Sequence, residues 1–171
     1  SDLGLGIDYI VNEEYLKGNI LSAYAAAGSF DEPFVLMDAD VAFPDALLKK
    51  LLDSPRANCL LLDTDFNNDA EEMKLGADAT GRVREINRHL TQDYPVKGEG
   101  VGFFKCSAAA GAVFRDLLKR RVENHEDTLE YETVLNDLMG EVLIGYELVA
   151  GLPWTEIDFP EDLERAREIF G

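Results

Sequence analysis

Two short, wholly apolar runs with a helical pattern between them constrain the fold of this chain more than any other feature. Phe34–Met37 and Cys59–Leu62 contain no polar side chain except a thiol, which is typical of strands buried on both faces of a parallel sheet. The segment between them starts at Pro44 and carries leucines at helical spacing, so it predicts a helix. A strand, a helix and a strand in this order form a βαβ crossover. The sequence therefore predicts an α/β fold with a mixed, mostly parallel sheet flanked by helices.

Strand and helix patterns continue on both sides of this unit. We expect a strand at 6–11, a helix at 20–27, a hairpin at 73–86, a strand at 100–104, a helix capped by Ser107 and running to about Arg121, a helix at 128–139, strands at 142–149 and 154–157, and a final helix from Pro160 to Phe170. The hairpin has a polar turn and is expected to be antiparallel. Because no repeat or linker interrupts the chain, we expect one domain over residues 1–171.

The net charge of the chain restricts the classes of molecule that it can bind. Sixteen Lys and Arg residues stand against 34 Asp and Glu residues, which gives a net charge of −18. Such a surface repels nucleic acid and anionic lipid, so we expect neither as a partner. A phosphorylated small molecule is still compatible when a divalent cation bridges the two anions. Only two cysteines, no membrane-length apolar run and no signal peptide favour a soluble, cytoplasmic protein with buried thiols.

Two carboxylates directly follow the first apolar run. Asp38 and Asp40 stand two residues apart after Phe34–Met37, and ligands of open α/β sheets bind at the carboxyl ends of the strands. Residues at this spacing on an extended backbone share a face, so both can approach one hard cation such as Mg²⁺. The alternative is that the two aspartates only terminate the strand and stabilise the loop after it.

A second carboxylate pair with the same spacing lies near the C-terminus. Glu156 and Asp158 are on an extended segment before Pro160. If the two pairs meet in the fold, they form an oxygen-rich site for one or two divalent ions. The alternative is that these acids favour the N-terminus of the following helix, and Asp158 can do both.

Five motifs follow one another in a recognisable order. They are Asp38-Ala39-Asp40, Glu71-Glu72-Met73-Lys74-Leu75, Gly81-Arg82-Val83, Gly98-Glu99-Gly100-Val101-Gly102 and Trp154-Thr155-Glu156-Ile157-Asp158. This order resembles that of the nucleotidyltransferases that act on sugar phosphates, phosphocholine and phosphonates, and it is most similar to that of the cytidylyltransferases. The resemblance extends from about Gly6 to Phe170. The resemblance implies a Rossmann-like domain that binds CTP with Mg²⁺. An acceptor phosphate or phosphonate oxygen then attacks the α-phosphorus and pyrophosphate leaves.

The resemblance also implies residue roles. Asp40 and Asp158 would bind the metal, with Glu156 beside them, and Lys74 and Arg88 would be the cations that face phosphate. In a second group, the nucleotide would lie near Asn19, Ser22 and Asp38. Attack of one phosphate on another needs positioning and charge compensation more than a base, because a phosphate oxygen is already ionised near neutral pH.

The acceptor is expected to contact Glu99, Tyr131, Glu132 and Trp154. The resemblance puts Glu99 on the acceptor side, and an ammonium group prefers aromatic faces beside a carboxylate. This slightly favours 2-aminoethylphosphonate or phosphocholine over inositol phosphate or a sugar phosphate. The alternative is that Tyr131 and Trp154 are packing residues.

One part of the family pattern is missing. These enzymes begin with a Gly-rich, basic loop after their first strand, which holds the triphosphate, whereas Gly4-Leu5-Gly6 has no basic residue after it. We therefore expect an N-terminally truncated domain that lacks one βαβ unit and binds CTP poorly alone. The missing unit would leave an unpaired sheet edge beside the strand that precedes Asp38, and a homo-oligomer can form at that edge. Two alternatives are a glycosyltransferase whose Asp-x-Asp pair holds the metal, and a non-catalytic binding or scaffold domain derived from the enzyme. Glu156-Ile157-Asp158 and Lys74 favour the nucleotidyltransferase.

Overall fold

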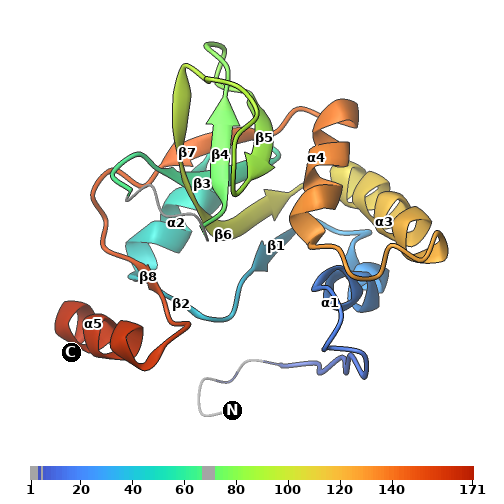
Figure 1. Cartoon of the computed structure of the whole chain (residues 1–171), viewed down its shortest axis with the longest axis horizontal. Helices are drawn as coiled ribbons and strands as arrows, with labels where there is room; N and C mark the ends of the chain where they lie inside the picture. The colour runs from blue at the N-terminus through green and yellow to red at the C-terminus, as the bar shows by residue number, and fades with distance from the viewer. Residues whose placement is uncertain (1–3, 5, 67–71) are drawn as a thin grey trace.

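The computed structural model describes residue 4 and residues 6–66 and 72–171 of the chain. Within these residues, six strands form one mixed sheet and two shorter strands pair beside it (Figure 1). The sheet contains β1 (Phe34–Met37), β3 (Cys59–Asp63), β4 (Lys74–Ala77), β5 (Val83–Asn87), β6 (Val96–Cys106) and β7 (Gly145–Leu148). The short strands are β2 (Val41–Ala42) and β8 (Thr155–Glu156), and the helices are α1 (Ile20–Ala25), α2 (Asp45–Asp53), α3 (Ala108–Glu123), α4 (Tyr131–Glu141) and α5 (Pro160–Phe170), with a 3-10 turn at Ala27–Ser29.

The long strand β6 organises the sheet. β3 pairs along one of its edges, while β4 and then β1 pair along the other, β4 with 96–99 and β1 with 103–106. β1, β3 and β4 are all antiparallel to β6, and β7 is parallel to β3. These four strands therefore share one direction and the sheet is mixed, as expected, while β3 and β7 are the one parallel pair of neighbours among the described strands. The expected crossover is present as β1–α2–β3, but β6 lies between its two strands.

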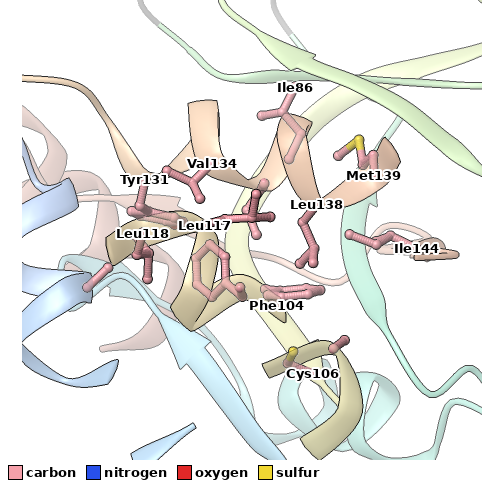
Figure 2. Close-up of a cluster of buried hydrophobic side chains, with 14 of the residues drawn as sticks. Ile86, Phe104, Cys106, Leu117, Leu118, Tyr131, Val134, Leu138, Met139 and Ile144 are labelled. Carbon is pink, nitrogen blue, oxygen red and sulfur yellow. The ribbon is translucent and has the colours of Figure 1, made fainter. Parts of the chain in front are cut away.

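Helices cover both faces of the sheet. Side chains of α1, α3 and α4 pack with Leu60, Leu62 and Phe104 in a large apolar cluster, and those of α2 pack with Leu61 and Phe103 in a smaller one. Figure 2 shows the large cluster, where side chains of α3 and α4 face those of β6. Burial of this apolar surface is the main stabilising contribution to a fold of this kind.

β1 takes part in both clusters. Phe34 and Leu36 pack against the large cluster, and Val35 and Met37 against the small one. Its side chains thus alternate between the two faces, as expected for an inner strand. In the part of the chain that the structure describes, β6 is nevertheless its single strand neighbour.

Most expected elements are present with small shifts of their ends. The hairpin β4–β5 is antiparallel, with Lys74 opposite Asn87. Ser107 caps α3, because its Oγ accepts a hydrogen bond from the backbone N–H of Ala110. Cys59 and Cys106 are both buried free thiols, as expected.

The strand expected at 6–11 is wrong. These residues form no helix or strand, and their apolar side chains are exposed, from 55% for Ile7 to 86% for Tyr9. β-branched and aromatic residues favour a strand only where a neighbouring strand accepts their hydrogen bonds. No such neighbour is present for this segment among the described residues.

A short arm connects the C-terminal segment to the end of β1. β2 and β8 pair antiparallel, with Val41 opposite Glu156, and the backbone N–H of Ile157 donates to the carbonyl of Asp40 over 2.9 Å. α5 then leads away from the sheet (Figure 1). None of the helices in the described residues has both the length and the apolar character needed to cross a bilayer.

Candidate active site

A cavity of about 280 Å³ opens where β1 ends, and both carboxylate pairs line it. Asp38 and Asp40 follow β1, and the β2–β8 pairing brings Glu156 and Asp158 to the same place. We call this space the first cavity. The structure therefore brings together four carboxylates from segments more than a hundred positions apart.

The floor of the first cavity is the backbone of β6. Gly100, Val101 and Gly102 line it, and they lie between the stretch of β6 that pairs with β4 and the stretch that pairs with β1. Because two of these three residues have no side chain, the neighbouring carboxylates have room above this backbone.

Asp38 is held by a tyrosine of α4. The hydroxyl of Tyr131 lies 3.1 Å from both carboxylate oxygens of Asp38, and the backbone N–H of Tyr131 donates to Oδ1 of Asn19 over 2.7 Å. Burial raises the pKa of Asp38 to about 6, in spite of the opposing effect of the tyrosine hydroxyl. Asn19 and Tyr131 both line the cavity.

Glu132 has a buried oxygen without a hydrogen bond. Its Oε2 lies inside the protein and has no partner, although the residue lines the first cavity. Burial is the main reason why its pKa rises to about 7, and the charges of Asp38 and Glu130 add to the rise. A buried acceptor of this kind is costly to leave unpaired, so a donor group of a ligand would stabilise it.

The expected cations differ in their positions. Arg88 lines the first cavity, and its guanidinium makes two hydrogen bonds to Glu130, at 2.7 and 2.6 Å. Lys74 is buried and lines neither of the described cavities. Its ammonium donates to the carbonyl oxygen of Arg88 over 3.0 Å, so it supports the chain that carries Arg88.

A second cavity, of about 710 Å³, adjoins the first. Trp154 and Glu99 line it, and the indole N–H of Trp154 donates to Asp63 over 2.7 Å. Burial raises the pKa of Glu99 to about 8, helped by the charges of Glu72, Glu156 and Asp63.

Three carboxylates line both cavities: Glu72, Glu156 and Asp158. We call them the shared wall. Burial raises the pKa of Glu156 to about 7, and the charges of Asp158, Asp40 and Asp38 raise it further. Negative charge is therefore concentrated where the two cavities meet, which is where a cation would be attracted most.

The expected site residues divide between these places. The acceptor candidates are split, with Tyr131 and Glu132 in the first cavity and Glu99 and Trp154 in the second. Ser22 lies on an exposed part of α1, where its hydroxyl accepts from Asn12, and it lines neither cavity. A further motif residue, Glu71, lies outside the described residues.

Sequence reasoning missed other residues of the site. Glu72 was not expected to line it, although it belongs to one of the motifs, and Glu130, which precedes two of the acceptor candidates on the same segment, was given no role of its own. The motif that contains the glycines of the cavity floor was recognised, but nothing in the sequence says which neighbour those glycines approach.

The donor set suits a hard divalent cation. Carboxylate oxygens are the ligands that Mg²⁺ prefers, and this ion usually takes only one or two of them and fills its other positions with water and substrate phosphate. In the described residues, no three His, Cys, Asp or Glu side chains gather closely enough to enclose a metal on their own. One carboxylate from each pair, completed by substrate oxygens, fits such an ion.

Two curated proteins with similar sequences carry the same name. The chain is 28% identical over 97% of its length to a bifunctional IPC transferase and DIPP synthase of Rubrobacter xylanophilus, and 25% identical over 94% to the protein of the same name from Aquifex aeolicus. It spans about a third of the length of these relatives, 36% and 34%. No family model matches the chain.

Solved structures with the same fold include cytidylyltransferases. The inositol-1-phosphate CTP transferase from T. maritima superposes with a TM-score of 0.70 and 17% identity, over 92% of this chain and 64% of that one. The CTP:phosphocholine cytidylyltransferase from Streptococcus pneumoniae gives a TM-score of 0.69 and 16% identity, over 94% of this chain and 67% of that one. The resemblance seen in the sequence is thus confirmed in the fold: this chain superposes on solved nucleotidyltransferases over 92% and 94% of its length.

Proposed function

We propose that this chain carries the site of a Mg²⁺-dependent nucleotidyl transfer from CTP to a small phosphate or phosphonate, with release of pyrophosphate. The observation that carries the proposal is the shared wall: Glu72, Glu156 and Asp158 line two adjoining cavities at once. A transfer between two substrates needs two places for ligands and a common point where they meet. The structural neighbours include CTP-dependent transferases, and the curated relatives carry the name of a bifunctional IPC transferase and DIPP synthase, which supports a transfer reaction of this class.

Asp40 and Asp158 would hold the cation, with Glu156 beside them. When bound, Mg²⁺ supplies the positive charge that lets two anionic substrates approach each other. The protein itself contributes the carboxylates at fixed positions, because Asp40 and Ile157 are joined through their backbones by a 2.9 Å hydrogen bond. In-line attack depends on such positioning more than on a base.

Arg88 would contact substrate phosphate at the mouth of the first cavity. Glu130 holds its guanidinium in place through two hydrogen bonds, and an anionic substrate competes with that carboxylate for the same donors. Asn19 and Asp38, in the same cavity, are the proposed contacts of the nucleotide.

The acceptor would be a small molecule whose second group donates hydrogen bonds or carries an ammonium. The orphaned Oε2 of Glu132 accepts a donor in the first cavity. Trp154 and Glu99 both line the second cavity, which therefore offers an ammonium group an aromatic face and a carboxyl group. We therefore propose 2-aminoethylphosphonate or phosphocholine as acceptors ahead of inositol phosphate or a sugar phosphate.

The test is pyrophosphate release by the purified protein with CTP, Mg²⁺ and each of these four acceptors in turn. We expect Asp40→Asn and Asp158→Asn to reduce turnover at least 100-fold, since each removes a ligand of the cation that the reaction needs. They should also reduce the heat of Mg²⁺ binding in titration calorimetry. Asp53→Asn, at the exposed end of α2, is the matched control.

Two results would contradict the proposal. Release of a nucleoside diphosphate from a nucleotide sugar, in place of pyrophosphate from CTP, would identify a glycosyltransferase. Full turnover in both site variants would mean that the metal carboxylates lie elsewhere.

A further inference from the structure

The motif Gly98-Glu99-Gly100-Val101-Gly102 contains a glycine whose backbone sets it apart. Gly102 has a φ of +74°, in the left-handed region that favours glycine. It lies at an irregularity of β6, because Leu60 pairs with Phe104 while Leu62 pairs with Gly100, so three residues of β6 lie opposite one residue of β3. This is a β-bulge, and bulges often reorient a side chain next to a site.

The neighbour that Gly102 approaches is Asp38. A Cβ at position 102 would lie 2.2 Å from Oδ2 of Asp38, far inside van der Waals contact. The backbone N–H of Asp38 also donates to the carbonyl of Gly102 over 3.1 Å, so the two residues are fixed relative to each other. The carboxylate therefore occupies the volume that any other residue type at position 102 would fill.

The displaced carboxylate would lose its partner. In the observed position both oxygens of Asp38 are 3.1 Å from the hydroxyl of Tyr131, and Tyr131 is buried. A shift of the carboxylate breaks this contact, so the buried hydroxyl loses its hydrogen bond to Asp38. Gly100 differs, since a Cβ there would meet Leu75 at an ordinary 3.4 Å.

We propose that Gly102 is a positioning residue of the first cavity, whose missing side chain lets the Asp38 carboxylate lie against Tyr131 where the nucleotide is to bind. The binding part of this inference rests on the proposed function. The spatial part, the exclusion of a side chain by Asp38, does not.

A double-mutant cycle on stability tests the spatial part. Gly102→Ala and Gly81→Ala both place alanine at a positive φ, but the Cβ at position 81 would meet only the end of the Arg56 side chain, at 3.4 Å. We expect Gly102→Ala to lower the folding equilibrium constant at least tenfold more than Gly81→Ala in urea denaturation. In an Asp38→Ala background, this excess should fall below threefold, because the two closest atoms, Oδ2 and Cγ, are gone and only the Cβ of residue 38 remains, at 3.1 Å. An excess that stays the same without Asp38 would overturn the proposal.

Nucleotide affinity tests the binding part. We expect Gly102→Ala to raise the KM for CTP at least tenfold with a smaller change in kcat, and to add nothing when Asp38 is already alanine. Gly81→Ala, in the hairpin turn, should leave both constants unchanged. If the stability cycle shows coupling but the KM for CTP stays the same, Gly102 is structural only and the positioning role is refuted. If the wild-type protein shows no turnover with any acceptor at CTP concentrations high enough to compensate for weak binding, the proposed function fails, and the stability cycle still decides the spatial part.

Discussion

Replacing Glu132 by glutamine should stabilise the protein without a ligand, and only at neutral or alkaline pH. Glu132 is a carboxyl group whose pKa is raised from 4.5 to about 7 in the folded protein, mainly by burial. Such a group binds its proton more tightly in the folded than in the unfolded chain. Ionisation therefore costs the folded state free energy, and the wild-type protein loses stability as the pH rises from about 4.5 to about 7.

The size of this loss follows from the pKa. One pKa unit corresponds to 1.36 kcal/mol, so the rise at Glu132 corresponds to about 3 kcal/mol above pH 7. Glutamine has nearly the same shape and no charge, so Glu132→Gln avoids this cost. Its amide also needs partners inside the protein, but that penalty is the same at every pH.

Urea denaturation at a series of pH values between 4.5 and 8.5 is the appropriate measurement. We expect the free energy of unfolding of Glu132→Gln, minus that of the wild type, to increase by about 2–3 kcal/mol across this range. Glu141→Gln, at the exposed end of the same helix, should show a constant difference. A difference at Glu132 that is independent of pH, or that shrinks as the pH rises, would refute the reasoning. If Glu132 contacts the acceptor as proposed, the stabilised variant should also bind acceptor more weakly, which is the usual exchange of stability for function.

Two further variants test contacts that shape the site. Asn136→Ala should destabilise the protein by about 2–3 kcal/mol in urea denaturation, because the Asn136 amide both donates to and accepts from the backbone of Ile86. A loss of stability below about 1 kcal/mol would show that β5 does not depend on this contact. Trp154→Phe keeps an aromatic ring but removes the indole N–H that donates a hydrogen bond to Asp63. We expect the free energy of unfolding to fall by about 1–2 kcal/mol in the same assay. An unchanged urea midpoint would mean that water replaces the hydrogen bond at no cost.

Local patterns predicted the elements whose ends depend on nearby residues. Ser107 and Pro160 start their helices as expected, because a cap or a proline acts on the next turn of the same chain. The apolar run Cys59–Leu62 became a buried strand for an equally local reason. The strand expected at 6–11 failed because its stability depends on a neighbour that the sequence pattern cannot specify.

The site was harder to predict because it depends on pairing between distant segments. Both carboxylate pairs were recognised, yet their meeting results from β2 and β8, which are only two residues long each. No periodicity exists in so short a strand. The division of the acceptor candidates between two cavities depends on the shared wall between them, and sequence spacing carries no information about that wall.

The position of β6 has a consequence for how the protein forms. In the six-stranded sheet, β1, β3 and β4 pair directly with β6. Two of these partners, β1 and β3, are synthesised well before β6. These contacts join residues far apart in the sequence, so the polypeptide must close long loops before the pairing can stabilise it, and folding should be slow for its size. Backbone amides of this strand should exchange last with solvent deuterium, since opening it separates β1, the β4–β5 pair and the β3–β7 pair from one another.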